Sequence, residues 1–339
     1  MEKTLFTTLD LHALFQMQTV ATTTLVKAEK DGLIPIAGRL KRGRVSVRQW
    51  RLDQLPQIGL KFGFLKRPKT TRVICVYTPK GGCLKSSLAY SLARMTSLNG
   101  LRTLIIGLDL QQTITDLALS PVALVESLED AVLSEGISDV ILHQTPLAKV
   151  IKETALPTLD IIPETAGLGM LEMQIRHMKR REYLLSEKIV RPLLKKYDVI
   201  FFDNSPNWNS LIENALTAAN VIISPIGCDL GSYQALDSNQ AMIANFRDEM
   251  KLHWDSQILV PTLLEKNKLS SQIYGSYLNK YSSLVTHTAI RRAVGGQEAL
   301  AVSQSPGEYN HKSDLARDYF DLAKEVWTRV LKDDVGNGK

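Results

Sequence analysis

A chain of 339 residues, of which 44% are hydrophobic and 22% charged, is too apolar for a disordered protein and long enough for a full core with a smaller second domain. Its three cysteines, Cys75, Cys83 and Cys228, have no paired or metal-ligand spacing, which excludes a disulfide framework and a zinc site. No segment approaches about 18 uninterrupted apolar residues, and the N-terminus lacks a long apolar run, so we expect a cytoplasmic protein that is neither exported nor membrane-spanning.

The net charge of +6 is concentrated near the N-terminus. Residues 1–72 carry 14 Lys and Arg against 5 Asp and Glu, an excess of +9, whereas the remaining residues carry 27 against 30. This asymmetry favours a polyanion as the partner of the N-terminal part. A solvated basic face without a partner is the alternative.

The first predicted elements are two short helices within residues 9–31, where apolar positions recur at helical spacing and end at the stop Asp31–Gly32. Basic residues then surround Gly43, and alternating valines behind them predict a hairpin with a short strand. A helix bearing Arg and Trp is expected next. This order resembles a MerR-like winged helix-turn-helix.

The resemblance implies that residues 1–67 form a small, basic, winged-helix-like domain that binds DNA, either nonspecifically or at a specific site. Its candidate DNA-binding residues are Arg39, Arg42, Arg44 and Arg48. Arginine contacts with phosphates supply affinity, whereas specificity requires a helix in the major groove. A partner protein or a second subunit is the alternative ligand. The sequence around Pro68 is typical of a linker, so the second domain is expected over residues 68–339.

From Arg72 onward, apolar runs of strand length alternate with helical segments. One helix is expected from Ser86 to Leu98, because Asn99–Gly100 follows as a stop signal. Short apolar strands separated by helices predict an α/β fold with a doubly wound, mostly parallel sheet.

The run from Thr78 to Ser87 lies between a predicted strand and a predicted helix, where backbone N–H groups and the helix N-terminus can surround a phosphate. In this geometry Lys85 reaches the β- and γ-phosphates of ATP, or the β-phosphate of ADP, and the Ser86 hydroxyl can bind Mg²⁺. The candidate nucleotide-binding residues are Lys80, Gly81, Gly82, Cys83, Leu84, Lys85, Ser86 and Ser87. A Gly- and Ser-rich turn without a ligand is the alternative.

This loop departs from the general form G-x-x-x-x-G-K-[ST] and resembles the form K-G-G-x-x-K-[ST] of the ParA/MinD family of deviant Walker-A ATPases, a group of P-loop NTPases. The additional lysine of that form falls on Lys80. The resemblance implies that Lys80 crosses a nucleotide-sandwich homodimer to the partner's phosphates and acts in catalysis. Leu84 stands where the family has glycine, and a leucine adopts positive φ only at a cost.

Two acidic motifs extend the resemblance. Residues 107–111 resemble the family's D-x-D-P-Q segment, with Gly107 in place of the first Asp. The resemblance implies that Asp109 is catalytic and positions the attacking water, and that Asp203 holds Mg²⁺ together with Ser86. Asp203 follows an apolar strand at the edge where doubly wound sheets collect ligands. A helix cap or a turn is the alternative role for each Asp.

The resemblance continues to about Leu331. Residues 290–299 resemble a family segment whose basic residues contribute to sequence-independent DNA binding, and Arg292 matches its first arginine while Gly295 replaces the second. The last predicted helix has a single apolar stripe and mixed charge. This pattern favours packing on the core over a MinD-like membrane helix, which would be richly basic.

The resemblance implies a ParA-like, Mg²⁺-dependent ATPase that dimerises with ATP on nonspecific DNA and drives DNA segregation or cargo positioning. A ParB-like adaptor would stimulate hydrolysis. We expect a nucleoid-associated protein without stable membrane association. A MinD-like regulator of division and a sequence-specific DNA-binding regulator with a degenerate ATPase remain alternatives. A nitrogenase-reductase-like protein would need paired cluster cysteines, which the sequence lacks.

Overall fold

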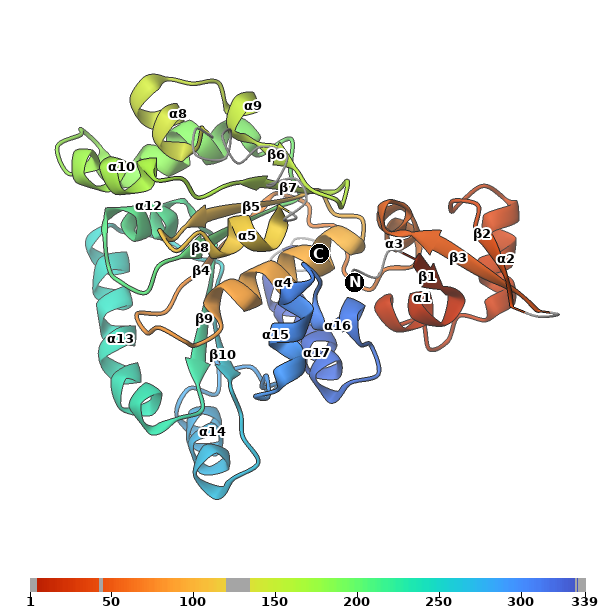
Figure 1. Ribbon diagram of the computed structural model, residues 1–339. Coiled ribbons are helices and arrows are strands. Elements are labelled where there is room, and N and C mark those ends of the chain that lie inside the picture. Colours follow the sequence, from red (N-terminus) through yellow and green to blue (C-terminus); the bar gives the residue numbers. More distant parts are fainter. Residues whose placement is uncertain (1–4, 43–44, 120–134, 333, 335–339) are drawn as a thin grey trace.

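The computed structural model describes residues 5–42, 45–119, 135–332 and 334 (Figure 1). The chain forms a three-stranded antiparallel sheet near its N-terminus and a seven-stranded, mostly parallel sheet in the remainder. In Figure 1 the small sheet and its helices lie to one side of the large sheet. The predicted α/β fold with a doubly wound, mostly parallel sheet is confirmed.

The N-terminal region combines three helices with the small sheet, whose strand order is β1-β3-β2. Its elements in chain order are β1 (Leu5–Thr7), α1 (Thr8–Leu14), α2 (Thr22–Lys30), β2 (Gly38–Arg42), β3 (Val45–Arg51), the 3₁₀ turn η1 (Leu52–Gln54) and α3 (Leu55–Phe62). The two predicted helices and the hairpin are therefore present.

The prediction of a helix bearing Arg and Trp is wrong. Arg48 and Trp50 lie on strand β3, and helix α3 begins only at Leu55. The reason is a strand that the sequence analysis did not predict: β1 pairs with β3 and places Phe6 opposite Trp50. Both aromatic side chains are buried, so this pairing extends the hairpin strand into the core of the N-terminal region.

The large sheet has the strand order β10-β9-β4-β8-β5-β7-β6, and only the edge strand β6 runs antiparallel to its neighbour. Its strands in that order are β10 (Ser256–Thr262), β9 (Val221–Gly227), β4 (Arg72–Val76), β8 (Val199–Asn204), β5 (Thr103–Leu108), β7 (Leu159–Ile162) and β6 (Lys152–Glu153). The central strands are buried along their whole length, which explains their continuous apolar sequence.

Helices cover both faces of the large sheet. On the first face lie α4 (Lys85–Leu98), α5 (Thr113–Ala118), α15 (Val294–Ala301), α16 (Pro306–Tyr309) and α17 (Asp314–Val330). On the second face lie α8 (Ile137–His143), α9 (Leu147–Val150), α10 (Gly167–Ile175), η2 (Arg181–Tyr183), η3 (Ser186–Val190), α11 (Arg191–Leu193), α12 (Ser210–Ala218) and α13 (Leu230–Glu249). Helix α14 (Lys268–Lys280) packs with a third, smaller apolar cluster beside β10. Along the central strands β4, β5 and β8, alternate side chains enter the first and the second core.

Helix α17 lies on the first face, as its apolar stripe predicts. The buried stripe residues are Leu315, Tyr319, Leu322, Val326 and Val330. The apolar side of the helix therefore packs on the core, and these five side chains are not exposed for contact with a membrane.

The N-terminal region is held tightly against the large domain. Helix α3 approaches the end of α4 so closely that a Cβ on Gly59 would lie 1.9 Å from the carbonyl oxygen of Leu98. The Asn99 side chain accepts a hydrogen bond from the backbone N–H of Leu65 at 3.1 Å. The indole of Trp327 donates to the carbonyl of Lys66 at 2.7 Å.

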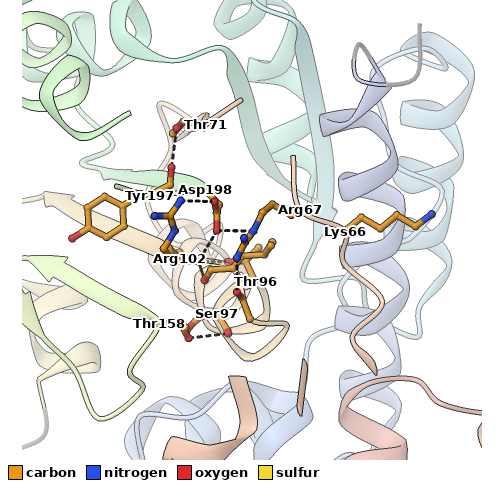
Figure 2. Close-up of polar contacts among 12 residues, drawn as sticks. Lys66, Arg67, Thr71, Thr96, Ser97, Arg102, Thr158, Tyr197 and Asp198 are labelled. Atoms are coloured by element: carbon orange, nitrogen blue, oxygen red, sulfur yellow. Dashed lines mark hydrogen bonds and ion pairs between the residues drawn. The ribbon is translucent and has the colours of Figure 1, made fainter. Parts of the chain in front are cut away.

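The predicted linker around Pro68 is also fixed by side chains. Figure 2 shows Asp198 between Arg67 of this segment and Arg102 of the large domain, with N–O distances of 3.3 and 3.1 Å. The Thr71 hydroxyl lies within hydrogen-bond distance of the carbonyl oxygens of Leu194 and Tyr197. The segment thus joins the two regions with a defined geometry.

Candidate functional site

The loop between β4 and α4 lies at the carboxyl edge of the large sheet. The strand is buried, and the first turn of α4 begins at Lys85 with N–H groups free of intrahelical partners. A Cβ placed on Gly81 or Gly82 would meet no heavy atom within 4 Å, and Gly82 has a φ of +74°. The loop therefore borders open space in which an anion can approach the backbone.

Leu84 adopts the left-handed conformation that the resembled motif assigns to glycine. Its φ and ψ are 64° and 30°, a conformation that costs a non-glycine residue roughly 1–2 kcal/mol. Its side chain packs against the first core and lines a cavity of about 250 Å³ that extends to Ser87 and Arg292. The backbone at Leu84 thus has the left-handed conformation that glycine adopts easily, and packing of the leucine side chain offsets part of the conformational cost.

Lys85 is buried inside the loop. Its Nζ donates a hydrogen bond to the carbonyl oxygen of Lys80 at 2.8 Å. Burial lowers the pKa of Lys85, and the nearby carboxylates of Asp203 and Asp109 act in the opposite direction. The ammonium group is therefore close to both predicted acidic residues, where it can neutralise an incoming phosphate.

Lys80 does not point toward Lys85 in the single chain. Its Nζ donates hydrogen bonds to Oδ1 of Asp229 at 2.7 Å and to the Ser232 hydroxyl at 2.8 Å, both at the start of α13. Burial acts to raise the pKa of Asp229, but the hydrogen bonds from Lys80 and Ser232 outweigh it and hold that pKa at about 2. Asp229 therefore stays ionised and holds Lys80 at the rim of the site.

Asp203 is fully buried on β8, in register with Val76 of β4 and Gly107 of β5. The pKa of Asp203 is raised to about 8, and burial is the largest cause; the Ser86 hydroxyl and Lys85 act to lower it, whereas the carboxylates of Glu164 and Asp109 act to raise it. Among the described residues, neither of its carboxylate oxygens has a hydrogen-bond partner of good geometry.

The bare carboxylate of Asp203 fits a site for a magnesium ion. A buried, unpaired carboxylate is costly unless a cation or a donor satisfies it. Hydroxyl and carboxylate oxygens are the ligands that Mg²⁺ prefers, usually with several waters. Ser86, at the start of α4, and Asp203 would hold the ion, and the phosphates would complete its ligands.

Asp109 lies one residue beyond β5 and is partly exposed. Its Oδ1 accepts a hydrogen bond from the backbone N–H of Gln111 at 3.1 Å, so it stabilises its own turn in this state. Helix α5 begins at Thr113, immediately after that turn. The turn reading and the catalytic reading of Asp109 are therefore compatible.

Three polar residues at this edge escaped the sequence analysis: Asp229, Ser232 and Glu164. Asp229 follows β9 and Glu164 follows β7, so each stands just after a buried strand, which is the signal that identified Asp203. A cavity of about 660 Å³ lies away from this edge, at the joint lined by Thr71, Arg102 and Asp198.

The candidate DNA-binding residues fall in two places. Arg39 is exposed on β2 and stands opposite Arg48 of β3. Arg48 also forms an ion pair of 3.0 Å with Glu29 of α2. Arg292, which is 60% exposed, pairs with Glu265 at 2.7 Å.

The two remaining candidates are Arg42 and Arg44. Arg42 is the last residue of β2, but its side chain is not described, and Arg44 lies outside the described residues. Arg39, Arg42 and Arg48 therefore lie on the two hairpin strands, whereas Arg292 belongs to the large domain.

Comparison with known proteins agrees with this geometry. A family profile described as AAA domain matches residues 71–256. The chromosome partitioning protein ParA of Caulobacter vibrioides is 27% identical over 261 residues, which cover 76% of this chain and 94% of that protein.

Two solved structures show the same fold. A partition protein superposes with a TM-score of 0.67 at 17% identity, covering 99% of this chain and 94% of its own, so its fold extends over the N-terminal region. Cobyrinic acid a,c-diamide synthase from Mycobacterium smegmatis, solved with an ATP analogue and magnesium, has a TM-score of 0.61 at 22% identity and covers 76% of this chain and 95% of its own. Both structures therefore share the fold of the large sheet and its helices.

Proposed function

Because the chain belongs to the AAA domain family, we propose that it is a ParA-like ATPase that binds ATP with Mg²⁺ and drives the segregation of DNA or the positioning of a cargo. The observation that carries the proposal is the meeting of the phosphate loop with the unpaired carboxylate of Asp203 at one edge of the sheet. The similarity to a chromosome partitioning protein over 94% of its length supports the cellular role.

In this proposal Lys85 and the loop N–H groups bind the β- and γ-phosphates. Lys85 turns from the Lys80 carbonyl to the phosphate, exchanging a neutral acceptor for a charged one. Ser86 and Asp203 hold Mg²⁺, which when bound neutralises phosphate charge. Asp203 is kept largely protonated by burial until a cation arrives, which prevents an uncompensated charge in the core.

Asp109 orients the attacking water in the proposed reaction, because phosphoryl transfer requires mainly positioning and charge neutralisation. Lys80 leaves Asp229 and reaches the phosphates of a second subunit in an ATP-dependent homodimer. Its present partner Asp229 is 51% exposed, so water can replace the lysine at small cost.

The proposed dimer binds DNA through basic residues of both regions. Arg39 and the hairpin tip supply phosphate contacts from the N-terminal region, which we propose to be a winged helix-turn-helix domain over residues 1–67. Arg292 contributes from the large domain over residues 68–339, once its exposed pair with Glu265 opens. A ParB-like adaptor would stimulate hydrolysis.

Membrane attachment is not part of the proposal. Within the described segments, no helix has the length and apolar character needed to cross a membrane. The proposed location is the nucleoid, through DNA binding.

Replacement of the phosphate-loop lysine tests the proposal. Lys85→Ala should lose at least about tenfold in ATP affinity, because a charged hydrogen bond to phosphate is worth roughly 1.5–3 kcal/mol. Fluorescent ATP binding and phosphate release measure affinity and turnover. Lys188→Ala is the matched control, because Lys188 is an exposed lysine of η3 and is not part of the phosphate loop. Equal ATP affinity in Lys85→Ala and wild type would refute the nucleotide site.

A further inference from the structure

The space beside Gly107 is filled by a side chain from the segment that follows strand β7. Gly107 of β5 is in register with Asp203 of β8, and registered residues of parallel strands, about 4.8 Å apart, face the same side of a sheet. A Cβ on Gly107 would lie 2.2 Å from Cδ and 2.4 Å from Oε1 of Glu164. The Glu164 carboxyl group therefore occupies the volume that a side chain at position 107 would take, next to Asp203.

Glu164 also holds the start of helix α5. Its Oε2 accepts hydrogen bonds from the backbone N–H of Thr115 at 2.8 Å and from the Thr115 hydroxyl at 2.6 Å. The same hydroxyl accepts from the backbone N–H of Glu164 at 2.8 Å, and Ile114 N–H lies 3.4 Å from Oε1. Glu164 is 2% exposed, so this clamp ties the end of β7 to the first turn of α5, which directly follows the turn that contains Asp109.

We propose that Glu164, two residues beyond the end of β7, supplies the carboxylate that position 107 lacks, and that it is a positioning residue for Asp109 and for the magnesium site at Asp203. The sequence has glycine where the resembled D-x-D-P-Q segment begins with aspartate, and the structure brings a carboxylate to that place from 57 residues further along the chain. This inference rests on the proposed ATPase function.

Two properties of the site agree with a role beyond packing. The Glu164 carboxylate contributes to the negative potential at Asp203, as does Asp109, so three acidic groups share an edge that a divalent cation would balance. A carboxylate that both clamps α5 and faces this edge couples the position of Asp109 to the cation. A side chain that only filled space beside glycine would need no charge.

Moving the carboxylate back to β5 tests the inference. Glu164→Gln keeps the size of the side chain and removes its charge; we expect kcat for ATP hydrolysis to fall at least tenfold. The thermal shift produced by ADP without Mg²⁺ should be retained, because the phosphate loop is unchanged. Gly107→Asp alone should also lose activity, because the new side chain collides with Glu164.

The double variant Gly107→Asp/Glu164→Ala restores a carboxylate at nearly the same place. Its kcat should return to within about threefold of wild type, because the effects of substitutions at two residues in contact are not additive. The matched double variant Gly107→Ala/Glu164→Ala restores volume without charge and should stay at least tenfold reduced. Glu153→Gln, at an exposed glutamate of β6, controls for the loss of a nearby charge.

The outcomes separate this inference from the proposed function. Wild-type kcat in Glu164→Gln, or equal recovery in the two double variants, would show that Glu164 only packs or caps α5 and would overturn the inference alone. If wild-type protein shows neither an ADP-induced thermal shift nor hydrolysis with duplex DNA present, the proposed ATPase function fails first. Rescue by the Asp variant, absent from the Ala variant, supports the positioning role.

Discussion

Arg94 of α4 and Glu308 of α16 form an ion pair whose side chains are only 3% and 0% exposed. The guanidinium donates from Nε to Oε2 at 2.8 Å and from Nη2 to Oε1 at 2.6 Å. The Ser305 backbone and hydroxyl also donate to Oε2. Because α4 starts at the phosphate loop, this pair fixes the nucleotide-site helix to the C-terminal part of the chain.

Glu308→Gln leaves Arg94 buried without a counter-charge. Loss of one partner from a buried ion pair typically costs about 3–5 kcal/mol, so the free energy of unfolding in urea should fall by that amount. Asp53→Asn, which breaks the exposed Arg51–Asp53 pair, should cost less than about 1 kcal/mol. Arg94→Met combined with Glu308→Gln should cost less than Glu308→Gln alone, since no uncompensated charge remains.

The pH dependence gives an independent check. Burial acts to raise the pKa of Glu308, but Arg94 and Ser305 outweigh it, so the pKa is lowered from its usual value. The stabilisation is therefore complete above the unfolded-state pKa of about 4.3, and it is lost as the pH falls through the lowered folded-state pKa. A loss below 1 kcal/mol in Glu308→Gln, with an unchanged acid limb, would refute this reasoning.

Three further predictions concern the site and the basic hairpin. Asp109→Asn should bind ATP normally while hydrolysis falls about 100-fold or more, and normal phosphate release would assign Asp109 to its turn alone. Asp203→Asn removes an unpaired buried carboxylate, so its free energy of unfolding in urea at pH 8 without nucleotide should exceed that of wild type by about 1–3 kcal/mol. The variant should also lose the Mg²⁺-dependent gain in ATP affinity. A variant less stable than wild type would contradict this prediction. Arg39→Ala should reduce the slope of log K for DNA binding against log salt concentration by about 0.9 in fluorescence anisotropy titrations. Arg51→Ala should leave that slope unchanged, because Arg51 is paired with Asp53. Equal slopes for the two variants would exclude a phosphate contact by Arg39.

The local parts of the fold could be predicted because they depend on neighbouring residues. The stop at Asn99–Gly100 ends α4 at Leu98 as expected, and the continuous apolar run before Asp203 forms the buried strand β8. The phosphate loop likewise is a contiguous segment. The resemblance to the ParA/MinD family, which was carried mainly by that loop, is confirmed by the family match and the partition relatives.

Local sequence patterns gave wrong predictions where contacts with residues distant in the chain decide the structure. Residues around Trp50 suggested a helix, but pairing with β1 requires an extended chain, and burial of Phe6 against Trp50 stabilises it. The segment around Pro68 has a linker composition, yet Arg67 is fixed by Asp198, which lies more than a hundred residues later. Neither partner is visible from the segment itself.

The sequence by itself determined the alternation of strands and helices from Arg72 onward, the parallel sheet and the identity of Lys85, Ser86 and Asp203 as site candidates, because period, punctuation and motif spacing are properties of contiguous residues. Only the tertiary structure decided that Glu164 fills the space beside Gly107 and that Asp229 holds Lys80. Those contacts join strand ends that are far apart in the chain, and the order of strands across the sheet, which local propensity does not encode, brings them within a few ångströms of one another.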